Sequence, residues 1–521
     1  MFPSNSKTVW IQDFKGYSDV AIPSDNPVTS QDQSNVFTRF GRVAGRGGMA
    51  KFDSISTSSG ADIIELVNYR QADGSHELLR ILPAAVNQWN DGGGSWDDIT
   101  GTALTAAVTN KPIYTIIDDT LIFTNEVDRP RKWAGSGNTS DVALSTAPYA
   151  KGCIAYLGFL FLFDVSDDGS FTDVFDGHRT GRYSDDWDAD WAGCDGNEIV
   201  LDETPGRWMN ACVLGRTLYG IKSDGVVGVR FNTSPQRFQQ DEVSSDVGML
   251  SKKSLGVAGR TLAFFLGTDG IIYQLSQQGM KAVTYEKLHE LLNNTRSLAR
   301  LQHARGVIDS RNDRYLLFYD RTGLTNQRLD SWISYNYRTE EVDKGTVGNS
   351  AATSIVSLSE WQATDQAAAA ILTGGPTLVH EFNSSTKDDD GVAVSGGRYW
   401  TSGWQPLAGE SGWVFGARLL MTKNRLGRVA VSIALNMEET FRWKQYFDLK
   451  GGATSDVWTE LEVEIPPAFV EWAKVKVEFF HDATNTTTPA TTTLIKAGFV
   501  VAPTKQVGVV KSRGSGNVRA T

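Results

Sequence analysis

The sequence contains few of the residues on which metal, redox and disulfide chemistry depend. Three cysteines and six histidines occur among its 521 residues, and neither type has the spacing of a metal site. An odd number of cysteines without paired spacing argues against a disulfide framework and fits folding in a reducing cytoplasm. We therefore expect Cys153, Cys194 and Cys212 to be buried as small apolar side chains.

The sequence also lacks the short motifs of several enzyme classes. It contains no Gly-x-Ser-x-Gly, no phosphate-binding Walker loop and no His-Glu-x-x-His. Carboxylates are numerous, but nothing in their spacing selects the pair that a glycosidase needs. The acidic segment 164–202 fails the pattern of an EF-hand, so an acidic loop is expected there, with bound calcium as the alternative. We therefore predict no catalytic residue, no cofactor and no metal site, in a protein that is not an enzyme.

Basic charge and long apolar runs are missing as well. The net charge is −11 and the isoelectric point is about 5.2, which argues against a surface that grips nucleic-acid phosphates. No apolar run reaches the roughly 18 residues of a membrane-spanning helix, and residues 1–10 lack the apolar centre of a signal peptide. Only residues 285–301 have apolar side chains at helical spacing. Together with 51 glycines and 24 phenylalanines, this predicts an all-β chain.

A repeated strand-turn-strand pattern is the clearest structural signal. Residues 215–219 (GRTLY) lead to Asp-Gly at 224–225, and residues 259–263 (GRTLA) lead to Asp-Gly at 269–270. The copies are 44 residues apart at Gly-Arg-Thr and 45 residues apart at Asp-Gly. Asp-Gly between two apolar runs is typical of a β-hairpin, because these residues tolerate the positive φ of a primed turn. A hairpin repeat of this length predicts the blades of a β-propeller.

Similar apolar segments recur along the chain. Their central residues are 39 to 58 positions apart, and they are Leu78, Leu121, Leu160, Leu218, Leu262, Leu316 and Ile371. We interpret them as the same inner strand in about seven irregular blades, which bury a continuous core by stacking. The alternative is a large array of β-sandwiches in which the similarity of the hairpins is due to chance.

Composition divides the chain into five parts. Residues 1–50 are rich in proline and polar residues, and we expect an extended arm that lies over another part of an assembly. Residues 51–385 form the predicted β-propeller, and the polar, glycine-rich segment 386–397 is the predicted linker. Alternating apolar and polar residues over 398–504 predict a C-terminal antiparallel β-sandwich. Residues 505–521 form a basic tail.

Several short motifs follow one another between residues 35 and 200. They are a Gly-Arg-rich turn at 41–48, Trp96-x-x-Ile99-Thr100-Gly101, Thr124-Asn125, Asp128-x-Pro130 with Trp133, and Arg182 to Trp187 before Trp191. In this order they resemble the tail nozzle, or hub, β-propeller proteins of short-tailed bacteriophages. The resemblance covers roughly residues 35–200 by motif and the remainder by architecture.

This resemblance implies a structural virion protein that assembles in the host cytoplasm. Such a protein forms a ring, expected to be a hexamer, below the portal and adaptor, where it lines and gates the DNA ejection channel. The implied partners are further copies of the chain, a tail adaptor or portal-proximal protein, a tail fibre or needle protein, and genomic DNA that passes without tight binding. Basic residues of the arm and the tail are the predicted partner contacts: Arg39, Arg42, Arg46, Lys505, Lys511, Arg513 and Arg519.

A second hypothesis is a glycan-binding or glycan-cleaving propeller with a C-terminal carbohydrate-binding sandwich. Propellers host glycosidases, and the sandwich begins with the aromatic residues Tyr399, Trp400, Trp404 and Trp413. Exposed rings would stack on sugars, whereas a buried cluster at the junction of the two domains is the arrangement that we expect.

Overall fold

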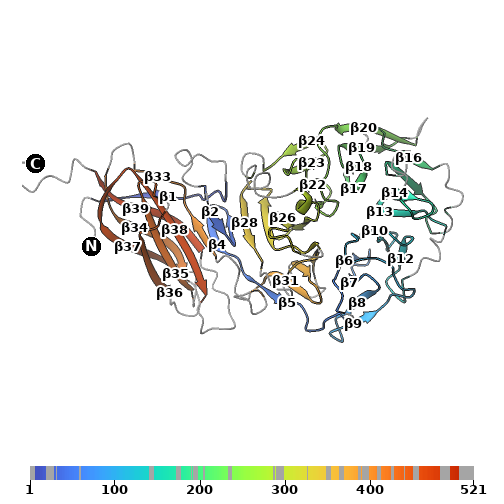
Figure 1. Ribbon diagram of the computed structural model, residues 1–521, viewed down its shortest axis with the longest axis horizontal. Coiled ribbons are helices and arrows are strands. Elements are labelled where there is room, and N and C mark those ends of the chain that lie inside the picture. Colours follow the sequence, from blue (N-terminus) through green and yellow to red (C-terminus); the bar gives the residue numbers. More distant parts are fainter. Residues whose placement is uncertain are drawn as a thin grey trace, which may run out of the picture.

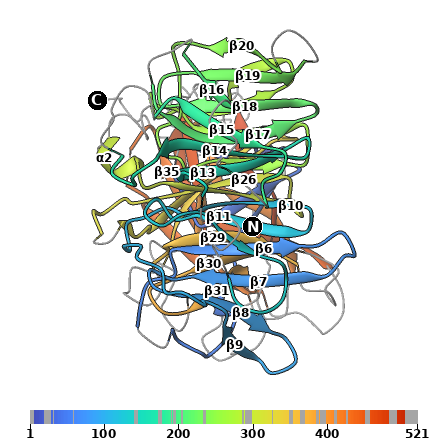
Figure 2. The same cartoon turned by 90° about the vertical axis from the view of Figure 1, so that its right-hand side faces the viewer.

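The computed structural model contains two β bodies, a propeller of small sheets and a sandwich of two larger sheets (Figure 1). Figure 2 views the molecule from the propeller side, with the sandwich strand β35 (Gly427–Leu435) behind it. The all-β fold predicted from the sequence, a propeller followed by a sandwich, is therefore confirmed. The structure describes residues 6–503 except 19–28, 31, 58–59, 140–145, 172–177, 189–190, 192–196, 203–205, 233–236, 285–287, 289–297, 325–326, 348–353, 363–368, 385–388, 390–397, 408–411, 424–426, 439, 450–456 and 482–492.

In the described residues the propeller consists of seven small antiparallel sheets, six with four strands and one with three. The first three sheets contain β6 (Glu65–Arg70), β7 (His76–Ile81), β8 (Val86–Asn90) and β9 (Ser95–Asp98); β10 (Ile113–Ile117), β11 (Thr120–Thr124) and β12 (Arg131–Trp133); and β13 (Tyr149–Tyr156), β14 (Phe159–Ser166), β15 (Thr180–Ser184) and β16 (Glu198–Val200). The next three contain β17 (Trp208–Leu214), β18 (Thr217–Lys222), β19 (Val226–Phe231) and β20 (Phe238–Ser244); β21 (Gly256–Ala258), β22 (Leu262–Leu266), β23 (Ile272–Ser276) and β24 (Gly279–Ala282); and β25 (Arg305–Asp309), β26 (Arg314–Tyr319), β27 (Ser331–Asn336) and β28 (Val342–Thr346). The last contains β29 (Ser357–Trp361), β30 (Ala370–Gly374), β31 (Val379–Ser384) and β5 (Gly48–Lys51).

The apolar segments found in the sequence all lie on the second strand of a sheet. Leu218 lies on β18 and Leu262 on β22, so the two copies of the hairpin occupy equivalent positions in successive sheets. The prediction that these segments are inner strands is wrong by one position, because first strands line the centre of the ring. Second strands carry the apolar signal because both of their faces are covered, and β18 and β26 are buried throughout.

The ring is closed by a strand from the arm. β5 pairs antiparallel with β31, so the last sheet combines the end of the propeller sequence with a segment that precedes its first sheet. Met49 on β5 is 1% exposed and belongs to the same apolar cluster as Ile371 and Phe382. The sequence analysis placed this segment in the arm and did not predict the closure.

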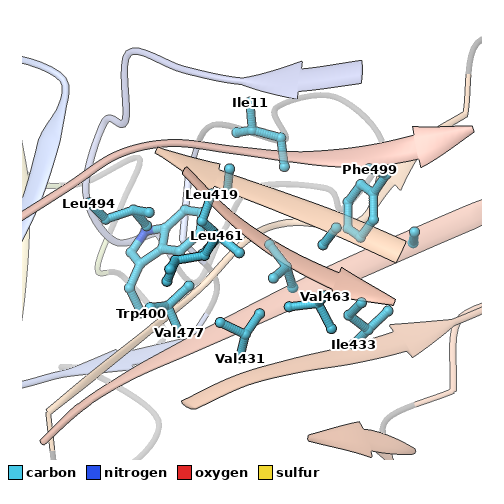
Figure 3. Packing of buried hydrophobic residues seen from close by; sticks show 14 of the residues in the cluster. Ile11, Trp400, Leu419, Val431, Ile433, Leu461, Val463, Val477, Leu494 and Phe499 are labelled. Atoms are coloured by element: carbon cyan, nitrogen blue, oxygen red, sulfur yellow. The ribbon is translucent and has the colours of Figure 1, made fainter. Parts of the chain in front are cut away.

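The sandwich is also completed by the arm. One sheet contains β1 (Lys7–Ile11), β3 (Val36–Arg39), β4 (Arg42–Gly45), β34 (Gly412–Lys423), β37 (Val457–Val470) and β39 (Thr493–Pro503). The other contains β2 (Asp32–Ser34), β32 (Tyr399–Thr401), β33 (Gln405–Pro406), β35, β36 (Trp443–Leu449) and β38 (Trp472–His481). Alternate residues of facing strands fill the space between the sheets, with Val431 and Ile433 opposite Leu461 and Val463 (Figure 3). The described parts of the arm therefore pack on their own chain.

Buried polar groups fix the arm between the two bodies. The Asp343 carboxylate on β28 accepts hydrogen bonds from Gln33 Nε2, Thr38 N and Thr38 Oγ1, each at 2.8 Å. Arg314 donates to the Thr38 carbonyl at 2.9 Å. Burial raises the pKa of Asp343, while the nearby Arg314 guanidinium opposes this shift. These buried groups cannot bond to water, so breaking any of these hydrogen bonds would leave a polar group without a partner. The arm is therefore held in one position on the propeller.

A second buried contact joins the arm to the segment predicted as a linker. Arg46 Nη2 lies 2.8 and 3.0 Å from the two carboxylate oxygens of Asp389, and both side chains are 0% exposed. Arg46 Nε donates to Asn35 Oδ1 at 3.3 Å, and Arg398 Nε donates to the Arg46 carbonyl at 2.6 Å. Asp389, the one described residue of 386–397, is thus held inside the molecule.

Three further expectations concern single residues. Cys153 and Cys212 are free and buried, as predicted, whereas Cys194 lies outside the described residues. Of the four aromatic residues expected in a core cluster, Trp400 and Trp404 are buried, whereas Tyr399 and Trp413 are half-buried. Of the predicted helix 285–301, the structure describes α2 (Leu298–Leu301), and most of the rest lies outside the described residues.

Candidate functional site: the central channel

A cavity lies at the centre of the propeller, where the first strands of the sheets face one another. Its volume is about 310 Å³. It is lined by polar side chains on β6, β10, β17, β25 and β29 and on the segment that precedes β21, and by the backbone between them. The polar lining residues are Glu65, Asn68, Tyr114, Asn210, Lys253, Arg305, Ser359 and Glu360. Because inner strands are rigid and come from separate sheets, the channel presents a preorganised polar surface.

Charged side chains gather where several of these inner strands begin. We define the cation cluster as Glu65, Lys111, Glu126, Lys252, Lys253 and Arg305. Glu65 accepts from Lys253 Nζ and from Arg305 Nη1, both at 2.9 Å, and Lys252 is paired with Glu126. Lys253 also donates to the Pro112 carbonyl at 2.7 Å. Four cations and two carboxylates therefore lie close together, and three of them, Glu65, Lys253 and Arg305, line the cavity.

Burial determines the protonation behaviour of this cluster. Burial, together with the nearby Arg305 and Lys253 charges, lowers the pKa of Lys111 to about 7. The pKa values of Lys252 and Lys253 are also lowered, mainly by burial. Burial raises the pKa of the Tyr114 hydroxyl, which therefore remains a hydrogen-bond donor.

Replacing Lys111 with methionine tests this assignment through the pH dependence of stability. The folded protein releases the Lys111 proton near pH 7, whereas the unfolded chain holds it up to about pH 10.4. The unfolded state binds more protons in this window, so the stability of the wild type should rise with pH relative to Lys111→Met. Urea midpoints at pH 7 and pH 9.5 measure the difference, with exposed Lys281→Met as control. Parallel changes in all three proteins would contradict the shift.

The opposite end of the channel carries a different carboxyl group. Glu360 on β29 accepts from Ser310 N at 2.7 Å and from Ser310 Oγ at 2.9 Å. Burial raises its pKa, although the hydrogen bonds from Ser310 counteract the shift. Between the two ends, Asn68 Nδ2 donates to the Glu360 carbonyl at 2.8 Å. Asn68 Oδ1 is buried and has no hydrogen-bond partner among the described residues.

A second buried cluster lies at the start of the acidic segment. Asp164, 1% exposed and with a φ of 51°, contacts His178 Nδ1 at 2.5 Å and Arg207 Nε at 3.2 Å. Arg207 Nη2 also lies 2.9 Å from His178 Nε2 and 3.2 Å from His178 Nδ1. An arginine and a histidine thus contact this carboxylate. The described residues contain no group of three or more histidine, cysteine or acidic side chains placed to hold a metal.

The motif residues named in the sequence analysis form hydrogen bonds that stabilise turns in the first sheets. Asn125 Oδ1 accepts from Asp128 N at 2.8 Å, and Asp128 Oδ2 accepts from Thr105 N at 2.9 Å. Trp133 Nε1 donates to the Gly137 carbonyl, and Trp191 Nε1 to the Trp187 carbonyl, both at 3.0 Å. These motifs therefore stabilise the fold and lie away from the channel lining.

The predicted partner contacts lie apart from the channel. Arg39 and Arg42 are exposed, and Arg39 Nη1 donates to Asn312 Oδ1 at 3.0 Å. Arg46 is buried against Asp389, where a partner cannot reach it. Lys505, Lys511, Arg513 and Arg519 lie outside the described residues. No helix in the described part of the chain is long and apolar enough to span a membrane.

No family model and no curated protein match this sequence. Among solved structures, the chain is similar to PorZ, an essential bacterial surface component of the type-IX secretion system of Porphyromonas gingivalis, with a TM-score of 0.34 and 8% identity. That match covers 71% of this chain and 44% of PorZ, so the chain spans less than half of that protein's length.

Two glycoside hydrolases are also similar in structure. An exo-β-1,3-galactanase from Phanerochaete chrysosporium has a TM-score of 0.26 and 10% identity, over 80% of this chain and 98% of the enzyme. A family 43 arabinoxylan arabinofuranohydrolase from Bacillus subtilis has a TM-score of 0.22 and 10% identity, over 93% and 99%. These likenesses concern the propeller fold alone.

The matches correct one expectation and leave another as a proposal. The prediction that the chain is not an enzyme is contradicted, because glycan-cleaving propellers are among the similar structures. None of the reported structures is a phage tail nozzle, so the tail function has no support from these matches.

Proposed function

We propose that this chain binds a glycan in the central channel of its propeller. The chemistry of the channel lining carries the proposal, because sugars are recognised through dense hydrogen bonding to carboxylates, amides and hydroxyls. The cavity offers all three kinds of group in a volume of about 310 Å³, which is at the lower end of ligand pockets. Asn68 adds a buried oxygen that has no partner within the described residues, and a sugar hydroxyl would satisfy it.

Two carboxyl groups in unlike surroundings add to this chemistry. Glu65 is ion-paired with Arg305 and Lys253, whereas burial raises the pKa of Glu360. Glycoside hydrolases typically use one ionised carboxylate together with one carboxyl group whose pKa is raised. Binding is therefore the proposal, and release of reducing sugar in the same assays would extend it to cleavage.

A glycan array followed by calorimetry on the best oligosaccharide tests the proposal. Asn68→Leu removes the free acceptor, and we expect binding about tenfold weaker, since a lost hydrogen bond of a buried group costs about 1 to 3 kcal/mol. Asn90→Leu, on the exposed β8–β9 hairpin, is the matched control and should bind like the wild type. The proposal fails if no glycan binds, or if both variants bind with unchanged affinity.

A ring component of a phage tail is the second candidate function. The ordered motifs between residues 35 and 200 support it, and so does the sandwich surface. Four of the six exposed aromatic side chains of the described residues lie on sandwich strands: Trp10, Tyr446, Phe469 and Phe480. Exposed apolar side chains favour protein–protein contact, as a ring of several copies requires.

The solution mass and shape of the purified full-length chain test this candidate. Light scattering and negative-stain imaging should find a closed ring, which we expect to contain six copies. The acidic chain should bind duplex DNA no tighter than about 10⁻⁶ M at physiological salt, the usual limit of non-specific affinity. A monomer at every concentration, or tight DNA binding, would count against a tail ring.

A further inference from the structure

Positively charged side chains outnumber negatively charged ones in the cation cluster. When all of its groups are ionised, the cation cluster contains four positive and two negative side chains. A buried charge without a counter-ion is costly, because burial removes its hydration. An anion that enters this end of the channel would remove that cost, so the cluster favours anionic ligands over neutral ones.

We propose that the cation cluster binds an oxyanion, namely the carboxylate or phosphate group of a small ligand in the channel. This inference deepens the proposed function and rests on it for the rest of the ligand, since a glycan held here would be acidic. The shared chemistry is a compact group with two or more negatively polarised oxygens, which ammonium and guanidinium groups bind through charge-assisted hydrogen bonds.

The cluster retains donors for such a group. The Lys253 ammonium has three N–H groups, and its contacts with Glu65 at 2.9 Å and with the Pro112 carbonyl at 2.7 Å use two of them. Lys111 Nζ donates to the Gln302 carbonyl at 2.6 Å and lies 3.5 Å from His303 Nδ1. Lys253 and Arg305 line the cavity together with the Tyr114 hydroxyl, a further donor.

Protonation of Lys111 makes the site sensitive to pH. The groups that face its ammonium are the Gln302 carbonyl, His303, Lys252, Lys253 and Arg305. Because its pKa is about 7, Lys111 loses its charge as the pH rises from 6 to 8. The pKa of His303 is also lowered, by burial and by Lys111. Anion affinity should therefore fall across this interval.

Calorimetry on the full chain at pH 6.5 tests the site with three probes, inorganic phosphate, glucuronate and neutral glucose. We expect either anion to bind more tightly than glucose. Lys111→Gln and Lys253→Gln should each weaken anion binding about tenfold, the worth of a charge-assisted hydrogen bond. Exposed Lys281→Gln is the matched control. Lys111→Gln should also abolish the loss of affinity between pH 6 and 8, and circular dichroism verifies that each variant folds.

The outcomes separate the inference from the proposed function. Preference for glucuronate identifies a sugar acid and supports both, whereas preference for phosphate identifies a phosphorylated ligand and supports the inference. Anion binding by a chain that binds no glycan overturns the proposed function and leaves the oxyanion site intact. Binding of neutral glycans without binding of either anion overturns the inference, as does anion binding that Lys111→Gln and Lys253→Gln leave unchanged.

Discussion

Replacing Asp389 with alanine is expected to lower the free energy of unfolding by about 3 to 5 kcal/mol, the cost of leaving a buried charge without its partner. Arg46 and Asp389 are both fully buried, and two oxygens of Asp389 lie within 3.0 Å of Arg46 Nη2. Without the carboxylate, the partners of the Arg46 guanidinium among the described residues would be the Asn35 side chain, the Thr346 carbonyl and the Phe382 ring, none of which carries a negative charge. Urea denaturation followed by tryptophan fluorescence measures the loss.

Arg39→Met is the matched control for this experiment. Arg39 belongs to the same arm, but it is exposed and contacts Asn312 at the surface. Its replacement should change the free energy of unfolding by no more than about 0.5 kcal/mol. Equal effects of Asp389→Ala and Arg39→Met would show that the buried pair does not hold the arm.

Replacing Met49 with aspartate should destabilise the propeller by about 4 kcal/mol or more, because it places a carboxylate without a partner in an apolar cluster. Met49 lies on β5, the strand that closes the ring against β31, and is 1% exposed. Loss of β5 would leave the edge of the last sheet open. Thermal unfolding and limited proteolysis should detect this opening through cleavage between β30 and β31.

Two further variants show whether the loss of stability in Met49→Asp comes from the buried charge. Met49→Ala creates a cavity without adding charge and should cost about 2 to 5 kcal/mol. Met437→Asp makes the same chemical change at a methionine that is 46% exposed, and it should leave stability nearly unchanged. A Met49→Asp protein as stable as the wild type would mean that β5 is not needed for closure.

The sequence predicted the fold because the fold repeats locally. Each hairpin places an apolar strand second in its sheet, where both faces are covered, and residues such as Leu218 and Leu262 therefore recur every 39 to 58 positions. The arm escaped prediction because its strands pair with partners far along the chain. No local pattern at Gly48 to Lys51 indicates that this segment joins the last sheet.

The channel site escaped prediction for a related reason. Glu65, Lys111, Lys253 and Arg305 come from the starts of four different inner strands, so only the closed ring brings them together. The tandem Lys252-Lys253 shortly before β21 was the one local signal, and in the structure Lys252 is buried and Lys253 half-buried, which is rare for lysine. The arginines of the arm were predicted as partner contacts, but Arg46 forms an ion pair inside its own chain.

The placement of the arm also affects how the chain is made. β1 pairs with β39, and β5 pairs with β31. Strands near the start of the chain therefore stay unpaired until strands far along it have been synthesised. The propeller cannot close before β31 has been made, and the sandwich cannot be completed before β39 has been made. Contacts this distant in sequence form slowly. A prematurely terminated chain would retain open sheet edges and an unclosed ring, which expose it to proteases. The first and last described strands therefore give the cell a means of distinguishing complete chains from fragments.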